Sequence, residues 1–359
     1  LLGVLVVLGG CSLTPVYTRP EAPVPTAWPT GPANDASPAS TDAAPVAEID
    51  WREFFTDERM QRVIATALEN NRDLRLAALN VQRARGIYGI QRAALFPALD
   101  ATSSGSKKRV PADLSSSGAR YTAEQYDVNL GVYAWEIDFF GRLRSLRDQA
   151  LEAYLATDEA RRSTQILIVS AVGETYLTLA ADREALKLAR TTFEAQKATY
   201  HLVKRRYDVG LATELDLNFA QTQVDIARRD MARYAQRVAQ DENALNFLVG
   251  RSTPVSGANL PEDLAGIKPL RAIDPGISSE VLLKRPDIIQ AEHLLKAANA
   301  NIGAARAALF PRVSLTSTVG TASAELSGLF EAGSGTWLFA PQIVMPIFDA
   351  RLWSAVDVT

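Results

Sequence analysis

Apolar residues recur at steps of three and four over much of the chain, which is the spacing of one face of an α-helix. The pattern predicts one helix that ends before Asn70, a second over about 73–95, and a third over 142–208. At 1.5 Å per residue the third helix would be roughly 100 Å long if unbroken. A compact domain does not need a helix of that length, so an elongated element is expected.

A short turn follows this longest helix at residues 209–212. Thr213 and Asp216 then form a variant of the capping box that starts many helices. Two long helices joined by so short a turn pair antiparallel. The sequence therefore predicts a long helical hairpin over about 142–249, with Gly210 at its tip.

A different period governs the stretch before the long helix. From Tyr126 to Ala134 every second residue is apolar, while Trp135 belongs to the alternate, more polar set. Alternation with period two is typical of a strand with two unlike faces. A weaker strand and a polar loop precede it, so we predict a β-hairpin over about 98–140.

The chain contains an internal repeat. A shift of 214 residues places residues 73–103 on 287–317 without a gap (73 + 214 = 287), and twelve of the thirty-one pairs are identical. The densest shared block is Arg-Ala-Ala-Leu-Phe-Pro, which begins at Arg92 in the first copy and at Arg306 in the second. Such a block, leading in both copies into a Ser/Thr-rich strand, indicates a tandem duplication.

The repeat sets the expected division of the chain. The first repeat covers 51–255, a linker covers 256–276, and an incomplete second repeat covers 277–359, with a helix over about 286–309 and a β-hairpin over about 311–349. The sequence ends where the first copy would start its long helix. We therefore expect a second long helical hairpin to lie beyond Thr359.

The N-terminal region has the composition of an anchored linker. An apolar run ends at Leu8-Gly9-Gly10-Cys11, with small residues before the only cysteine, which resembles the cleavage site of a lipoprotein signal peptide. We interpret 1–10 as the remnant of a signal peptide and 11–50, rich in Pro, Ala, Ser and Thr, as a lipid-anchored extended linker. Acyl chains on Cys11 would give a firm membrane anchor. An Asp directly after the lipidated cysteine favours retention in the inner membrane of many bacteria, and this chain has Ser12 there. Sorting to the outer membrane is therefore expected.

Composition and charge exclude several classes of protein. A net charge of -3 gives no basic face for nucleic acid. His201 and His293 stand on predicted helices with no Cys or acidic cluster at ligand spacing, so no metal site is expected. We find no nucleophile motif and no phosphate-binding glycine loop, and hence expect neither catalytic residues nor a cofactor, apart from covalent lipid on Cys11.

Two β-hairpins supply four strands, fewer than the eight or so that close a transmembrane barrel. Open sheet edges cannot face lipid, so the strands demand oligomerisation. Three chains of four strands would give twelve, and the same symmetry would gather the helical hairpins into a helical tube. The predicted fold is therefore a tandem-duplicated protomer of a trimeric, 12-stranded transmembrane β-barrel with a periplasmic α-barrel.

Several stretches after residue 50 carry a family resemblance. The chain resembles the TolC-like outer membrane factors, and especially their lipidated NodT-type multidrug efflux branch. The matching stretches are WREFFTDERMQRVIATALENNRDL at 51–74, WEIDFFGRLR at 135–144, DVGLATELD at 208–216, LLKRPDI at 282–288 and GAARAALFPRVSL at 303–315. Near 348–352 the sequence lacks the glycine usual in that family's motif.

The resemblance implies partners and functional residues. It implies a homotrimer in the outer membrane that passes drugs or other small molecules outward, docked to a periplasmic adaptor and an inner-membrane pump, commonly a proton-driven one of the RND type. It assigns adaptor docking at the helical tip to Val209, Gly210, Leu211 and Thr213. Its candidates for the periplasmic gate are Asp216, with Glu214, Arg205, Arg206 and Tyr207 beside it.

Alternatives remain open at this point. Asp216 could serve only as a helix N-terminal carboxylate favoured by the macrodipole. Aromatic residues such as Trp337 could form the interfacial girdle of a barrel or pack in a core. The duct could instead be a type I secretion exit for polypeptides, or the chain could be a structural periplasmic coiled-coil lipoprotein without a channel, although the latter leaves the duplicated strand hairpins unexplained.

Overall fold

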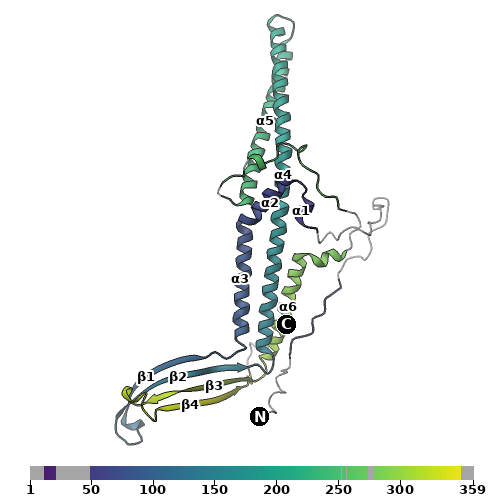
Figure 1. Ribbon diagram of the computed structural model, residues 1–359. Helices are drawn as coiled ribbons and strands as arrows, with labels where there is room; N and C mark the ends of the chain where they lie inside the picture. The colour runs from purple at the N-terminus through teal and green to yellow at the C-terminus, as the bar shows by residue number, and fades with distance from the viewer. Residues whose placement is uncertain (1–11, 22–48, 252, 256, 274–278, 349–359) are drawn as a thin grey trace. The chain divides into compact units, whose positions relative to one another are not determined.

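The computed structural model describes residues 12–21, 49–251, 253–255, 257–273 and 279–348. The signal-peptide remnant, Cys11 and the end of the chain after Phe348 lie outside the described residues. The helices are α1 (Trp51–Phe54), α2 (Glu58–Asn70), α3 (Arg72–Ala93), α4 (Arg142–Asp208), α5 (Glu214–Val249) and α6 (Pro286–Ala307) (Figure 1). The strands are β1 (Asp100–Val110), β2 (Tyr121–Ile137), β3 (Arg312–Ser323) and β4 (Gly335–Val344).

The duplication is visible in the element bounds. Helix α3 begins at Arg72 and α6 at Pro286, and the two helices end at Ala93 and Ala307, so both ends differ by 214 residues (286 − 72 and 307 − 93). Each helix leads into a strand hairpin, as the shared sequence block predicts. The predicted helices and hairpins are thus present in the described residues, with ends shifted by a few positions.

The repeats are not the compact units of the molecule. One unit takes in 1–21, 82–156 and 291–359, and the other takes in 22–81 and 157–290. The first unit therefore holds the strand hairpins of both copies. Sequence repetition marks the duplicated segments, but long-range contacts join the copies in space.

The first unit contains a four-stranded antiparallel sheet in the order β1-β2-β3-β4 (Figure 1). Strands β2 and β3 pair across the two copies, with Leu130 opposite Val319. Within the described chain, β1 and β4 each have a strand on one side only. These two open edges are the structural reason to expect pairing with other strands.

A β-bulge interrupts strand β2 between Val132 and Trp135. Ala134 lies within it at a φ of +51°, unusual for a residue with a side chain, and its amide donates to the Thr316 hydroxyl at 3.0 Å. Val132 faces Ser317, whereas Trp135 faces Leu315 two residues away. The bulge places Trp135 on the same face of the sheet as Val132, although alternation predicts opposite faces for these two residues. The strict alternation predicted for this strand is therefore wrong after Val132.

The N-terminal arm, residues 12–21, lies along α6 in the first unit. The Thr14 hydroxyl is 3.1 Å from that of Ser145 on α4, and the Asn299 side chain donates to the Pro15 carbonyl at 2.8 Å. Arg19 pairs with Glu292, and the Lys296 ammonium lies 5.3 Å from the Tyr17 ring centre. The predicted linker is thus fixed to the protein over these ten residues by polar contacts.

The second unit is built around an apolar core between α2, α4 and α5. Met60 and Ile64 of α2 pack with Val172, Tyr176 and Leu179 of α4 and with Leu245 and Val249 of α5, all of them fully or almost fully buried. A side chain at Gly173 would collide with the Phe55 ring, at 2.7 Å from its nearest atom. By length and composition alone α4 could also cross a membrane, a test that core helices pass as well.

Candidate functional site

The turn between α4 and α5 is closed by a glycine that ends the longer helix. Gly210 has a φ of +79°, and its amide donates to the Tyr207 carbonyl at 2.9 Å. The Leu211 amide donates to the Arg206 carbonyl at 2.7 Å. These two bonds make a Schellman motif, which satisfies the last carbonyls of α4 and requires a residue that tolerates positive φ. Gly210 therefore fixes where the hairpin turns, as its position predicts.

The first turn of α5 is held by the predicted capping box. The Asp216 amide donates to the Thr213 hydroxyl oxygen at 3.2 Å, and the Asp216 carboxylate accepts from the Thr213 amide at 2.9 Å and from its hydroxyl at 2.7 Å. The Thr213 hydroxyl and amide, together with the positive charge of Arg206, hold the pKa of Asp216 below its ordinary value of 3.8. Asp216 is consequently an anion at neutral pH.

The other gate candidates lie around the same tip. The Arg206 guanidinium reaches the Leu211 carbonyl at 3.5 Å, and Tyr207 contributes its carbonyl to the turn. Among the described residues, the Arg205 and Glu214 side chains form no hydrogen bond or ion pair, and both are exposed. The structure therefore brings Asp216 together with Thr213 and Arg206, and it leaves the Arg205 and Glu214 charges on the surface.

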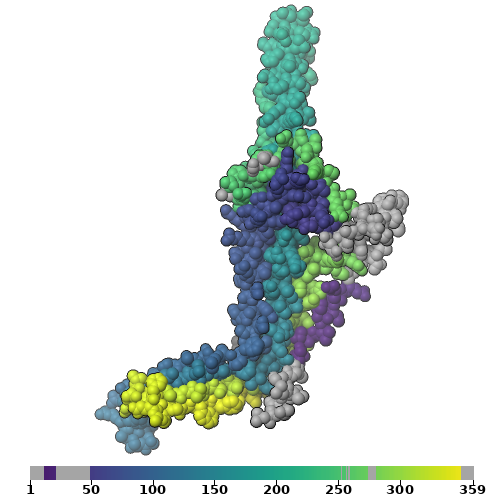
Figure 2. Space-filling model, in the orientation of Figure 1, coloured from purple at the N-terminus to yellow at the C-terminus, as the bar shows by residue number. Residues whose placement is uncertain are grey.

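The tip also carries an exposed apolar surface. Val209 is 68% exposed and Leu211 is 69% exposed, and the first turns of α5 add Leu215 and Phe219, which are similarly exposed. In Figure 2 the tip stands clear of the other described segments of the second unit. Sequence reasoning missed Leu215 and Phe219, although their four-residue spacing on one helix face was a usable signal.

The sheet of the first unit presents a second apolar surface. On one face Leu130, Val319 and Trp337 lie side by side on adjacent strands, and Trp337 is 77% exposed. On the other face Ser104 donates to Asp127 at 2.6 Å. A sheet with one apolar and one polar face suits a position between lipid and water.

A metal site in the described part of the chain would need several His, Cys, Asp or Glu side chains close together. No group of three or more His, Cys, Asp or Glu side chains comes together there. His293 instead makes a single polar contact, with its Nδ1 atom 2.6 Å from an oxygen of Glu152. These partners are 141 residues apart, so sequence spacing gave no sign of the contact.

The chain forms a sheet with one apolar face and two open edges, and it also forms a long helical hairpin with an exposed tip. This combination is typical of the protomers of membrane channels. Comparison with known proteins identifies the family. A profile described as "Outer membrane efflux protein" matches residues 63–251 and 277–359. The chain belongs to this family and is an outer-membrane component of an efflux system.

Two curated relatives show the extent of the similarity. The probable efflux pump outer membrane protein TtgC of Pseudomonas putida is 50% identical over 344 residues, covering 96% of this chain and 70% of TtgC. Outer membrane protein OprJ of Pseudomonas aeruginosa is 41% identical over 347 residues, covering 95% of this chain and 70% of OprJ. The match extends over almost the whole chain.

Solved structures agree with this assignment. A membrane protein from Pseudomonas aeruginosa has a TM-score of 0.87 at 39% identity, covering 97% of this chain and 76% of that one. The open-state MtrE outer membrane channel of Neisseria gonorrhoeae has a TM-score of 0.82 at 36% identity, covering 97% and 75%. The TolC-like fold predicted from the sequence is thereby confirmed.

Proposed function

We propose that three copies of this chain form a passive duct through the outer membrane. The observation that carries the proposal is the four-stranded sheet with one apolar face and two open edges. Three copies with four strands each would supply twelve strands, more than the eight or so needed to close a barrel. Closed threefold symmetry would pair every open edge with that of a neighbour.

The duct would work as one part of a three-part pump. We ascribe docking of a periplasmic adaptor to the exposed tip residues Val209, Gly210, Leu211 and Thr213, and propose that an inner-membrane pump of the RND type supplies the energy. Relatives are named as toluene, solvent and antibiotic efflux proteins, which supports small apolar molecules as cargo rather than polypeptides. We ascribe no catalytic role to the chain.

Asp216 is our candidate for a charged constriction at the periplasmic mouth. In a trimer it would recur three times around the axis, with Arg205, Arg206, Tyr207 and Glu214 nearby. A ring of carboxylates attracts cations and repels anions. The lowered pKa of Asp216 supports this role because the ring would remain charged at the pH of the periplasm.

Lipid on Cys11 would tie the protomer to the outer membrane. The support is the run of small residues before Cys11 and the described arm that follows it directly. Mass spectrometry of protein purified from membranes should find an acylated N-terminal cysteine. Recovery of mature protein with an unmodified Cys11 would contradict this part of the proposal.

The decisive experiment measures mass and conductance together. Purified protein should have the mass of three chains in detergent and should give single-channel currents in planar bilayers. Asp216→Asn keeps a capping oxygen but removes the charge, so we expect the preference of the channel for cations over anions to fall about twofold or more. Asp225→Asn, at an exposed position further along α5, should leave this preference unchanged.

Adaptor docking requires a separate readout. Leu211→Asp should abolish cross-linking to the adaptor while trimer mass and conductance stay at their original values. A protein that remained monomeric and non-conducting would refute the duct itself. Unchanged cross-linking in the Leu211→Asp protein would refute only the docking assignment.

A further inference from the structure

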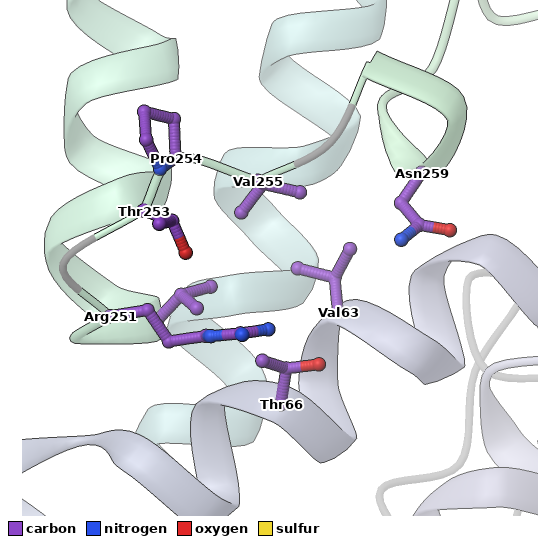
Figure 3. A pocket seen from close by; sticks show the side chains of 8 residues that line it. Val63, Thr66, Arg251, Thr253, Pro254, Val255 and Asn259 are labelled. Atoms are coloured by element: carbon purple, nitrogen blue, oxygen red, sulfur yellow. The ribbon is translucent and has the colours of Figure 1, made fainter.

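A pocket in the second unit lies where α2 meets the end of α5 and the segment that follows it. It encloses about 270 Å³. Figure 3 shows the side chains that line it, and its walls come from Val63, Thr66, Val249, Arg251, Thr253, Pro254, Val255 and Asn259. All of these residues belong to the second unit, and none of them is part of the hairpin tip or of the sheet.

Two polar side chains of this pocket, those of Arg251 and Asn259, present hydrogen-bond donors. The Arg251 side chain extends between Val63 and Thr66 (Figure 3), and among the described residues its guanidinium has no hydrogen-bond or ion-pair partner. The Asn259 carbonyl oxygen accepts from Arg62 at 3.1 Å, which turns the amide nitrogen toward the pocket. No acidic side chain is among the lining residues. A free guanidinium and a free amide N–H₂ together suit an anion.

The remaining walls are aliphatic. Val63 and Val249 belong to the buried core, and Pro254 and Val255 close the opposite side. The volume is slightly below the 300 Å³ or so at which pockets begin to hold drug-sized ligands. The space therefore fits one short aliphatic group with an attached anion, and it is too small for a typical transported drug.

We propose that this pocket binds the free carboxylate of a peptide that ends in a short aliphatic residue. A planar carboxylate can accept two parallel bonds from the Arg251 guanidinium, and the aliphatic walls leave room for a side chain that inorganic phosphate lacks. The Asn259 amide would donate a further bond, while the valine side chains and Pro254 would cover the aliphatic group. Capture of a chain terminus in this way is a known mode of peptide recognition.

The test is calorimetric titration of the complete trimeric protein with N-acetyl-L-valine. We expect a Kd on the order of 1 mM, since a small ligand meets one solvent-accessible cation. Arg251→Gln should weaken binding tenfold or more, and Arg251→Lys should weaken it less, because lysine keeps the charge but not the planar fork. Val255→Asp should abolish binding, because its carboxylate would occupy Arg251.

Matched ligands and a control variant define the result that would overturn the proposal. N-acetyl-L-valinamide has the same shape without the charge and should bind at least tenfold more weakly. Arg229→Gln removes an exposed arginine of α5 that does not line the pocket and should leave the Kd unchanged. Equal binding of the amide, equal binding by the Arg251→Gln protein, or tighter binding of inorganic phosphate would each refute a peptide-carboxylate site. None of these outcomes bears on conductance, which tests the duct.

Discussion

Helices α3 and α6 are copies of one sequence, yet they have opposite environments. Helix α6 buries a row of small residues, namely Ala297, Ala300, Gly303, Ala304 and Ala307, whereas α3 buries none of its residues. Four large apolar residues of α3, namely Leu76, Leu79, Ile87 and Ile90, are exposed in the single chain, with Ile90 at 70%. The shared motif therefore specifies a helix and the strand after it, but it does not specify what covers the helix.

The residues that cover α6 lie outside its own repeat. Gly303 faces Thr14 of the arm and Ser145 of α4, and an added methyl group there would lie 2.1 Å from the Thr14 hydroxyl oxygen. Gly89 occupies the equivalent position in α3 (89 + 214 = 303), and nothing lies within 4 Å of its would-be side chain. We infer that the uncovered face of α3 is the one that meets a neighbouring copy in the proposed trimer.

Alanine at the two equivalent glycines should have effects of opposite sign. Gly303→Ala should destabilise by about 1–2 kcal/mol, because overpacking against Thr14 and Ser145 outweighs the gain in helix propensity. Gly89→Ala should stabilise a detergent-dissociated monomer by about 0.5–1 kcal/mol, because nothing lies within 4 Å of the added methyl group. Thermal unfolding followed by circular dichroism measures both.

Chymotrypsin cleavage after Tyr17 provides the readout specific to the arm. It should become faster in the Gly303→Ala protein and stay unchanged in the Gly89→Ala protein. Equal shifts in the two unfolding midpoints of the monomers would show that the environments of α3 and α6 do not differ in the single chain.

Much of this comparison could be predicted from the sequence, but the cover on α6 could not. The repeat, both helices and their strands follow from periodicity and from identities between the copies. The arm has no periodicity, and its contacts join residues as far apart as Pro15 and Asn299, 284 positions away. The bulge at Ala134 could not be predicted either. The alternation of apolar and polar residues continues through it in the sequence, whereas the regular backbone geometry of the strand is interrupted there.

The candidate site was predicted to a similar extent. Gly210, Thr213 and Asp216 follow from local turn and capping chemistry, which depends on neighbours within a few residues. The pocket around Arg251 could not be predicted, because α2 and the segment after α5 meet only through the tertiary fold. Turns and helix caps can therefore be predicted from this sequence, whereas a pocket formed by distant segments cannot.

A second matched pair lies at the end of the shared block. Phe310 stacks on Phe140 with ring centres 4.8 Å apart and is 40% exposed, while its equivalent Phe96 is 63% exposed. Phe310→Ala should cost about 1–2 kcal/mol from lost ring contact and burial. Phe96→Ala should cost less in a detergent-dissociated monomer, and urea unfolding of the monomers compares them. A larger loss at Phe96 would contradict the difference seen in the single chain.

A third pair isolates one hydrogen bond to the arm. Asn299→Ala removes the donor to the Pro15 carbonyl and should cost about 0.5–1 kcal/mol, the net value of such a bond less the gain in helix propensity. The equivalent residue of α3 is the exposed Arg85, and Arg85→Ala should be close to neutral. Hydrogen exchange of the amides of residues 12–21 should speed up only in the Asn299→Ala protein. Unchanged exchange would show that contacts other than the Asn299–Pro15 hydrogen bond keep the arm in place.

The smallest expected effect depends on pH and on a carboxylate that only α6 possesses. A hydrogen bond from Arg19 and a second one from Lys296 hold the pKa of Glu292 below its ordinary value of 4.5, and the equivalent residue of α3 is Ala78. A lowered pKa stabilises the folded state above pH 4.5, and this contribution is lost as the pH falls through the pKa of the folded protein. Because Arg19 is half exposed, the gain at pH 7 should stay below about 1 kcal/mol. The unfolding midpoint of Glu292→Gln should therefore fall less than that of the original protein between pH 7 and pH 4. If the two midpoints fell equally with pH, Glu292 would not hold the arm.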